Sequence, residues 1–193
     1  MKIQINSYIP ITNVEGAGTR FAIWVQGCSI HCKGCANSHM WNFDGGRSYE
    51  INDFINIIKS YSDKIEGITW LGGEPLDQIN AVTQISKVVR NFGLSVILFT
   101  GYEYENLKDK PEFQELKKYI DILIDGEYKE TKQDFSRAWV GSSNQNYYFL
   151  SDRYNKSDIS KYKNKIEIRI SEDNKVLITG MGDMKKLKEV IKL

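Results

Sequence analysis

Hydrophobic positions follow two alternating patterns along the first two thirds of the chain. Short, nearly continuous apolar runs are typical of strands that are buried on both faces. These runs lie at residues 21–27, 68–71, 95–100 and 120–124. Apolar positions at helical spacing predict amphipathic helices between and beside the runs. These lie at residues 50–60, 77–91 and 112–119. Strands that alternate with helices predict right-handed crossovers and an α/β fold of mostly parallel strands.

The pattern changes after about residue 143. Apolar runs at residues 166–170 and 176–179 flank a polar segment at residues 171–175, which predicts a β-hairpin with an Asp-Asn turn. Residues 183–192 carry apolar positions beside four lysines and predict a short closing helix. This helix could bind a membrane or a partner, but we favour a docked terminal helix with a solvated lysine face.

Composition and charge narrow the class of protein. The chain has 193 residues with Lys+Arg 26 and Asp+Glu 25, a formal net charge of +1. This length makes one domain the default, and the near-neutral charge argues against a dedicated nucleic-acid binder. No apolar run approaches the ~18 residues of a membrane span, and the N-terminus lacks the apolar stretch of a signal peptide. We therefore expect a soluble cytoplasmic protein that binds neither nucleic acid nor membrane.

Every strong soft-metal ligand lies in one short stretch. It contains all three cysteines, Cys28, Cys32 and Cys35, and both histidines, His31 and His39. An odd number of cysteines excludes a closed disulfide framework. The clustering instead indicates a metal site in a reducing compartment.

The CxxxCxxC spacing directly after a predicted strand favours an iron–sulfur cluster. A cubane cluster takes ~4 thiolates when it is fully bound by protein, so three thiolates leave one iron open to a small molecule. The alternative is a structural zinc site with three cysteines and either His31 or His39 as ligands. A catalytic cysteine is less favoured, because no histidine lies elsewhere in the chain to act as its base.

Arg20 and the four tryptophans have simpler interpretations. The run of residues 16–20 precedes a strand rather than a helix, which argues against a phosphate loop. We expect Arg20 to anchor the opening of the site. Trp24, Trp41, Trp70 and Trp139 are expected to be core or site-wall aromatics, with core packing favoured for Trp24 and Trp70.

Short motifs around the cysteines resemble those of radical S-adenosylmethionine (SAM) enzymes. The motifs are Gly16-Ala17-Gly18-Thr19-Arg20, Trp24-Val25-Gln26-Gly27-Cys28, Asn37, Trp41, Gly72-Gly73-Glu74-Pro75, Thr100-Gly101-Tyr102, Asp125-Gly126 and Gly141-Ser142-Ser143-Asn144-Gln145. Residues 8–150 are similar to the activating enzymes of anaerobic (class III) ribonucleotide reductase and, more distantly, of pyruvate formate-lyase. Residues 151–193 extend beyond this radical SAM core.

The resemblance implies a fold, two cofactors and a set of ligands. The fold would be a partial (incomplete) (β/α) barrel with a C-terminal hairpin and helix. The three cysteines would hold a [4Fe–4S] cluster whose open iron chelates SAM. The implied SAM-binding residues are Gly72, Gly73, Glu74, Pro75, Thr100, Tyr102, Asp125 and Asn144. Alternatives remain for two of them: Asp125 could instead cap a turn, and Asn144, like Gln145, could instead stabilise a loop.

The resemblance also implies a reaction. The enzyme would reductively cleave SAM to a 5′-deoxyadenosyl radical and generate a glycyl radical on anaerobic ribonucleoside-triphosphate reductase, with electrons from a flavodoxin- or ferredoxin-like protein. The cofactors carry this chemistry, so no side chain is assigned as catalytic. One alternative is a radical SAM enzyme that acts on another glycyl-radical enzyme, a peptide or a small molecule. Another is a non-catalytic zinc-binding module.

Overall fold

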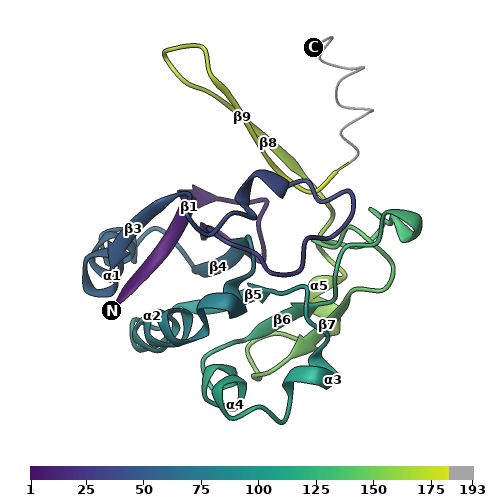
Figure 1. The fold of residues 1–193 in the computed structure, drawn as a ribbon, viewed down its shortest axis with the longest axis horizontal. Helices are drawn as coiled ribbons and strands as arrows, with labels where there is room; N and C mark the ends of the chain where they lie inside the picture. The colour runs from purple at the N-terminus through teal and green to yellow at the C-terminus, as the bar shows by residue number, and fades with distance from the viewer. Residues whose placement is uncertain (183–193) are drawn as a thin grey trace.

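A seven-stranded sheet runs through the protein in the order β3-β1-β2-β4-β5-β6-β7 (Figure 1). The computed structural model describes residues 1–182, so the helix predicted at residues 183–192 lies outside the described residues. The strands are β1 (Lys2–Thr12), β2 (Arg20–Val25), β3 (Arg47–Glu50), β4 (Gly67–Gly72), β5 (Ser95–Phe99), β6 (Ile122–Asp125) and β7 (Asn146–Phe149). The four central strands β2, β4, β5 and β6 are parallel, whereas β1, β3 and β7 join through antiparallel pairs. The predicted α/β class with a mostly parallel central sheet is confirmed.

The predicted strands are present with bounds shifted by one or two residues, but three strands were not predicted. The longest of these is β1, although its first residues alternate strictly between apolar and polar. A register shift between Ile5 and Ser7 puts Tyr8 beside the core that Ile3 and Ile5 enter, while Ile9 enters the cluster on the other face. One bulge therefore lets a single strand contribute to both faces of the sheet.

Helices cover one face of the sheet. The longer ones are α1 (Ile51–Lys59), α2 (Ile79–Asn91) and α4 (Pro111–Lys117), which lie side by side, with α2 in the middle (Figure 1). All three were predicted, although residues 75–78 form a separate 3-10 turn, η2 (Pro75–Gln78), before α2 begins. The remaining short elements are α3 (Tyr104–Leu107), α5 (Lys156–Ile159), η1 (Ser38–Met40) and η3 (Glu130–Lys132).

The main core lies between these helices and the sheet. Trp70 and Phe54 are both fully buried there, as predicted for Trp70, and the indole Nε1 of Trp70 donates a hydrogen bond to Ser86 Oγ at 3.0 Å. The opposite face is covered by loops and by α5: Ile97, Ile122 and Ile124 pack against Ala17, Ala138, Trp139, Val140 and Ile159.

Arg20 lies at the amino ends of the parallel strands, away from the carboxyl ends where the candidate site forms. Its guanidinium is fully buried and donates hydrogen bonds to Thr69 Oγ1 at 3.1 Å, to Ser95 Oγ at 2.5 Å and to the Ile68 carbonyl. Burial lowers its pKa to about 10. The expectation that Arg20 anchors the opening of the site is wrong, because its donors satisfy buried acceptors of β4 and β5.

The predicted C-terminal hairpin is confirmed as a separate two-stranded sheet, β8 (Ile166–Ile170) and β9 (Val176–Gly180), which projects from the rest of the protein (Figure 1). Its turn contains Asn174 at φ +59°, a left-handed conformation that asparagine tolerates. Within residues 1–182, no helix has the length and apolar character needed to cross a membrane.

Replacing Phe54 with Ala is expected to lower the free energy of unfolding by about 3–5 kcal/mol, because its ring is fully buried against Tyr8, Phe21 and Tyr49. The matched control is Phe43→Ala, which removes a ring that is 51% exposed and should cost less than about 1 kcal/mol. Urea unfolding measures both variants. Equal losses would contradict the placement of the core.

Candidate functional site

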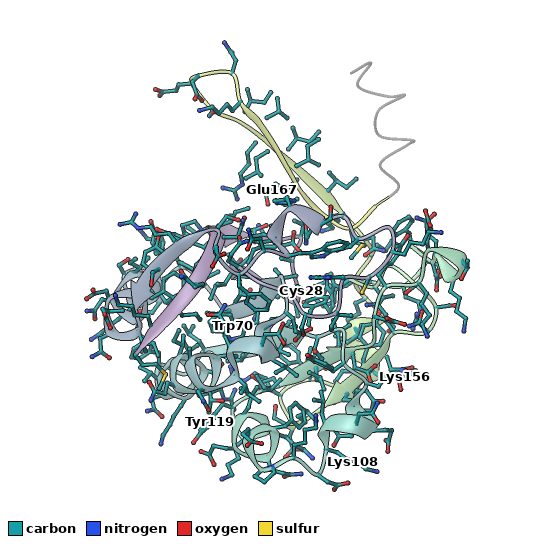
Figure 2. All side chains as sticks on the ribbon, viewed as in Figure 1. Cys28, Trp70, Lys108, Tyr119, Lys156 and Glu167 are labelled. Carbon is teal, nitrogen blue, oxygen red and sulfur yellow. The ribbon has the colours of Figure 1, made fainter. Side chains whose placement is uncertain are left out.

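A pocket lies where the parallel strands end. Figure 2 shows Cys28 in the middle of the domain in this view, and Glu167 at the base of the hairpin. Of the residues predicted to bind a cluster or SAM, seven line the pocket: Cys28, Cys32, Cys35, Gly72, Gly73, Glu74 and Thr100. The other four, Pro75, Tyr102, Asp125 and Asn144, lie outside its lining. The pocket contains about 900 Å³ of empty space, which includes space open to solvent.

The cysteine loop begins at the end of β2 and returns beside it. The N–H of Cys28 donates to the Trp41 carbonyl at 3.1 Å, and the N–H of Gly27 donates to the Met40 carbonyl at 2.8 Å. All three cysteines are free; Cys28 is buried, and the other two are half-buried. Burial raises the pKa of the Cys28 and Cys32 thiols, although backbone hydrogen bonds oppose the shift.

The loop brings three thiols to the pocket but no histidine. His31 and His39 are exposed and outside the lining, and the ring of His31 stacks on Trp41 at 4.7 Å between centroids. In the described part of the chain, no three cysteine, histidine or acidic side chains are placed to hold a single metal ion. A cubane cluster does not require such convergence, because each thiolate binds a different iron.

Glycines at the end of β4 let its backbone approach β2 closely. A Cβ on Gly73 would lie 2.0 Å from the Gly27 carbonyl oxygen, and one on Gly72 would lie 2.5 Å from the Val25 nitrogen. The Gly73 and Glu74 N–H groups donate to the carbonyls of Val25 and Gly27 at 2.9 and 2.8 Å. The two strands therefore stay paired up to the residue before Cys28, which fixes where the cysteine loop starts.

Glu74 connects the ends of β4 and β5. One carboxylate oxygen accepts from the Thr100 hydroxyl at 2.8 Å and the Leu76 N–H at 2.9 Å, and the other accepts from the Gly101 N–H at 2.8 Å. Burial raises the pKa of Glu74 to about 7, while these donors lower it. Glu74 therefore shapes the pocket floor through protein contacts, and its contact with the SAM ammonium stays a prediction.

A second acidic side chain, Asp77, ties the cysteine loop to the two neighbouring strand ends. Asp77 Oδ2 accepts from the Ser29 N–H at 2.7 Å, and Oδ1 accepts from the hydroxyls of Ser29 at 2.9 Å and Tyr102 at 3.0 Å. Tyr102, predicted to touch SAM, thus holds the loop next to Cys28.

Asp125 and Asn144 stabilise local structure. Asp125 accepts from the Tyr104 N–H at 2.7 Å at the start of α3, and from the N–H and side-chain amide of Asn146 at 3.2 and 3.1 Å. Its contact with SAM stays a prediction. The Asn144 amide donates to the Glu127 carbonyl at 2.9 Å. The side chain of Gln145, which does line the pocket, bridges Gly126 and Gly141.

The rest of the lining includes residues that were not singled out from the sequence, among them Val14, Glu15, Tyr128 and Met181. Glu15 is buried, and its carboxylate accepts from the Gly180 N–H at 2.6 Å. Burial raises the pKa of Glu15 to about 7, and the nearby Glu167 also raises it, whereas the Gly180 donor lowers it. These residues come from loops and the C-terminal extension, where no local motif marks them.

The residues present fit an iron–sulfur cluster with a small polar ligand. Three thiols, the donors such clusters prefer, face one pocket. Two buried polar atoms near it, Asn144 Oδ1 and Trp41 Nε1, have no hydrogen-bond partner within residues 1–182. Buried polar atoms normally have hydrogen-bond partners, and a polar ligand in the pocket would supply the missing ones.

Comparison with known proteins agrees with this chemistry. Residues 14–148 match the family described as the 4Fe-4S single cluster domain. The chain is 35% identical over 145 residues to the anaerobic ribonucleoside-triphosphate reductase-activating protein of Haemophilus influenzae, covering 72% of this chain and 92% of that protein. The proteins of the same name from Vibrio cholerae and Enterobacteria phage T4 are 36% and 34% identical, covering 72% and 77% of this chain and 94% and 96% of theirs. QueE from Escherichia coli is a more distant structural match, with a TM-score of 0.43 and 18% identity over 52% of this chain and 53% of QueE.

Glu15→Gln is expected to remove a pH-dependent loss of stability. The pKa of Glu15 is about 7 in the folded protein, against an ordinary value of 4.5, so folding favours its protonated form. The contribution of protonated Glu15 to the free energy of unfolding is fully present below pH 4.5 and is lost as the pH rises through about 7. The glutamine keeps an acceptor for Gly180, so the variant should match the wild type at about pH 5 and exceed it at about pH 8 by up to about 3 kcal/mol. Urea unfolding at both pH values measures this; a difference independent of pH would contradict it.

Asp77→Asn is expected to loosen the cysteine loop. The two carboxylate oxygens of Asp77 accept from the N–H and the hydroxyl of Ser29, whereas an amide has only one oxygen that can accept. The three thiols are the only ones in the chain, so a thiol reagent reports on this loop alone. In cluster-free protein, labelling should accelerate roughly tenfold, as expected for the loss of one charge-assisted hydrogen bond. Asp63→Asn, on an exposed loop, is the control. Equal labelling rates in the two variants would refute the anchoring role.

Proposed function

Because this chain belongs to the 4Fe-4S single cluster domain family and to the anaerobic ribonucleoside-triphosphate reductase-activating proteins, we propose that it cleaves SAM reductively to generate a glycyl radical on an anaerobic ribonucleoside-triphosphate reductase. It is a glycyl-radical activase of the radical SAM class. The observation that carries the proposal is the meeting of three free thiols with the glycine-rich end of β4 in one pocket.

The chain's residues have distinct proposed roles. Cys28, Cys32 and Cys35 hold a [4Fe–4S] cluster and leave one iron open for SAM. A reduced cluster held by these cysteines would supply the electron for reductive cleavage of SAM to methionine and a 5′-deoxyadenosyl radical, and that radical would take the hydrogen atom from the glycine.

The residues proposed to contact SAM differ in whether their polar groups are already hydrogen-bonded within the protein. Gly72 and Gly73 line the pocket and would present backbone to polar groups of SAM, although the Gly73 N–H already donates to the Val25 carbonyl. Asn144 lies outside the lining, but its Oδ1 has no partner within residues 1–182 and would be available to SAM. Glu74 and Thr100 already bond to each other, so they would offer their remaining acceptor capacity to the ammonium. Pro75, Tyr102 and Asp125 would act by holding the strand ends in place, through η2, Asp77 and α3.

The partners follow from the same reaction. We propose a single radical SAM domain built as an incomplete (β/α) barrel, whose lateral opening admits the glycine-bearing loop of the reductase. A flavodoxin- or ferredoxin-like protein would supply the electron. Cytoplasmic location and the lack of nucleic-acid binding belong to this proposal as well.

A second target within radical SAM chemistry is favoured by one observation: Met181, from the C-terminal extension, lines the pocket. Another glycyl-radical enzyme, a peptide or a small molecule would then be the substrate. Co-incubation with the reductase separates the two, because a glycine-radical signal in its electron paramagnetic resonance spectrum supports the first target. SAM cleavage without that signal supports the second.

Cys32→Ala is expected to abolish both the cluster and SAM cleavage. The wild type, reconstituted anaerobically with iron and sulfide, should carry ~4 of each per chain and form 5′-deoxyadenosine with dithionite and SAM. His39→Ala is the control, because His39 is exposed and outside the pocket, and it should keep its iron. Cleavage retained by Cys32→Ala would refute the ligand assignment, and colourless protein with one zinc would favour the zinc-binding module.

A further inference from the structure

The C-terminal extension, of which residues 151–182 are described, lies beyond the part of the chain that matches the family. The family match ends at residue 148, and the three relatives match 72–77% of this chain but 92–96% of their own length. The extension nevertheless packs into the domain. Ile159 is buried in the cluster that covers the second face of the sheet, and Tyr154 and Tyr162 pack against that cluster.

One contact of the extension holds a pocket residue in an unfavourable backbone conformation. Trp139 lines the pocket at φ +60°, which a residue with a bulky side chain rarely adopts. Its N–H donates to Asn164 Oδ1 at 2.7 Å, and its ring lies 4.9 Å from that of Tyr162. Asn164 Nδ2 donates in turn to the carbonyls of Phe135 and Arg137, both at 2.8 Å. Asn164 therefore fixes the segment that presents Trp139.

A second set of contacts fixes the base of the hairpin to another pocket wall. The Gly180 N–H donates to Glu15, Thr12 Oγ1 donates to Glu167 at 2.5 Å, and the Arg169 guanidinium donates to the Ile11 carbonyl. The next residue after Gly180 is Met181, which lines the pocket. The extension therefore joins the end of β1 and the residues that follow it, up to Glu15, to the loop at residues 135–141, across the pocket.

The chemistry of the pocket lining indicates which kind of substrate segment the pocket admits. Besides the cysteines and glycines, the lining includes the apolar residues Val14, Phe99, Trp139 and Met181 and the buried acidic residues Glu15 and Glu74. It contains no lysine, arginine or histidine among the described residues. A site for a phosphate-bearing substrate normally presents cationic donors. A peptide segment without acidic side chains suits these walls better.

We propose that the C-terminal extension forms a wall of the pocket and determines which peptide segment of a partner protein reaches it, with Asn164 as a positioning residue for Trp139 and Met181 as a specificity-determining residue. This inference rests on the proposed function. It predicts that the extension adapts an otherwise shared site to this chain's own partner.

The test uses the full-length, cluster-loaded protein with the reductase as the partner. Met181→Ala and Asn164→Leu should each raise the KM for the partner by about fivefold or more, with a smaller change in kcat. Both should also speed the removal of cluster iron by a bulky chelator, which needs no turnover. Met181→Leu keeps the apolar volume and should restore the wild-type KM. Ile170→Ala, at the far end of the same hairpin and 72% exposed, is the matched control and should leave both readouts unchanged.

Two results would overturn the inference. One is a partner KM and a chelation rate that are unchanged in both Met181→Ala and Asn164→Leu. The other is a partner KM that rises in Ile170→Ala but not in Met181→Ala, which would put recognition at the hairpin tip. Failure of the proposed function looks different, because the wild type would then form no 5′-deoxyadenosine from SAM and dithionite.

Discussion

The candidate site depends on the close backbone contact between the ends of β2 and β4. Gly73 approaches Gly27 so closely that any side chain on it would collide with the Gly27 carbonyl. The backbone segments at the ends of β2 and β4 remain hydrogen-bonded to each other up to Glu74. Cys28 is the next residue after Gly27, so this contact sets where the thiol-bearing loop leaves the sheet. The pairing thus links the two motifs that carry the chemistry.

Two carboxylates, buried Glu74 and half-buried Asp77, extend this frame to the neighbouring strands. Glu74 binds the Thr100 hydroxyl and the Gly101 N–H, and Asp77 binds Ser29 in the cysteine loop and Tyr102 after β5. A carboxylate can accept several hydrogen bonds at once, which makes it effective at joining separate backbone segments. Several residues expected to touch a ligand therefore hold one another, and much of the ligand surface is left to backbone, thiols and loop residues.

The sequence predicts features that depend on local pattern and misses those that depend on distant contacts. The buried strands, the amphipathic helices, the hairpin and the cysteine loop each have a signal within about ten residues. β1 also had one, in its alternating isoleucines, and was still missed. By contrast, Glu15 and Met181, which had no local signal, line the pocket beside the contact between Gly180 of the extension and Glu15. The prediction for Arg20 was wrong because the sequence does not distinguish an arginine buried at the amino end of a strand from one that lies at a site.

The central claim is that three thiolates hold a cluster with one iron open to SAM. Mössbauer spectroscopy of the anaerobically reconstituted, iron-57-labelled protein tests it most directly, because it separates the ~4 irons of a cubane by their ligands. The account predicts that one iron of each cluster changes its isomer shift when SAM is added, while the other three do not. Irons that are all insensitive to SAM would contradict it.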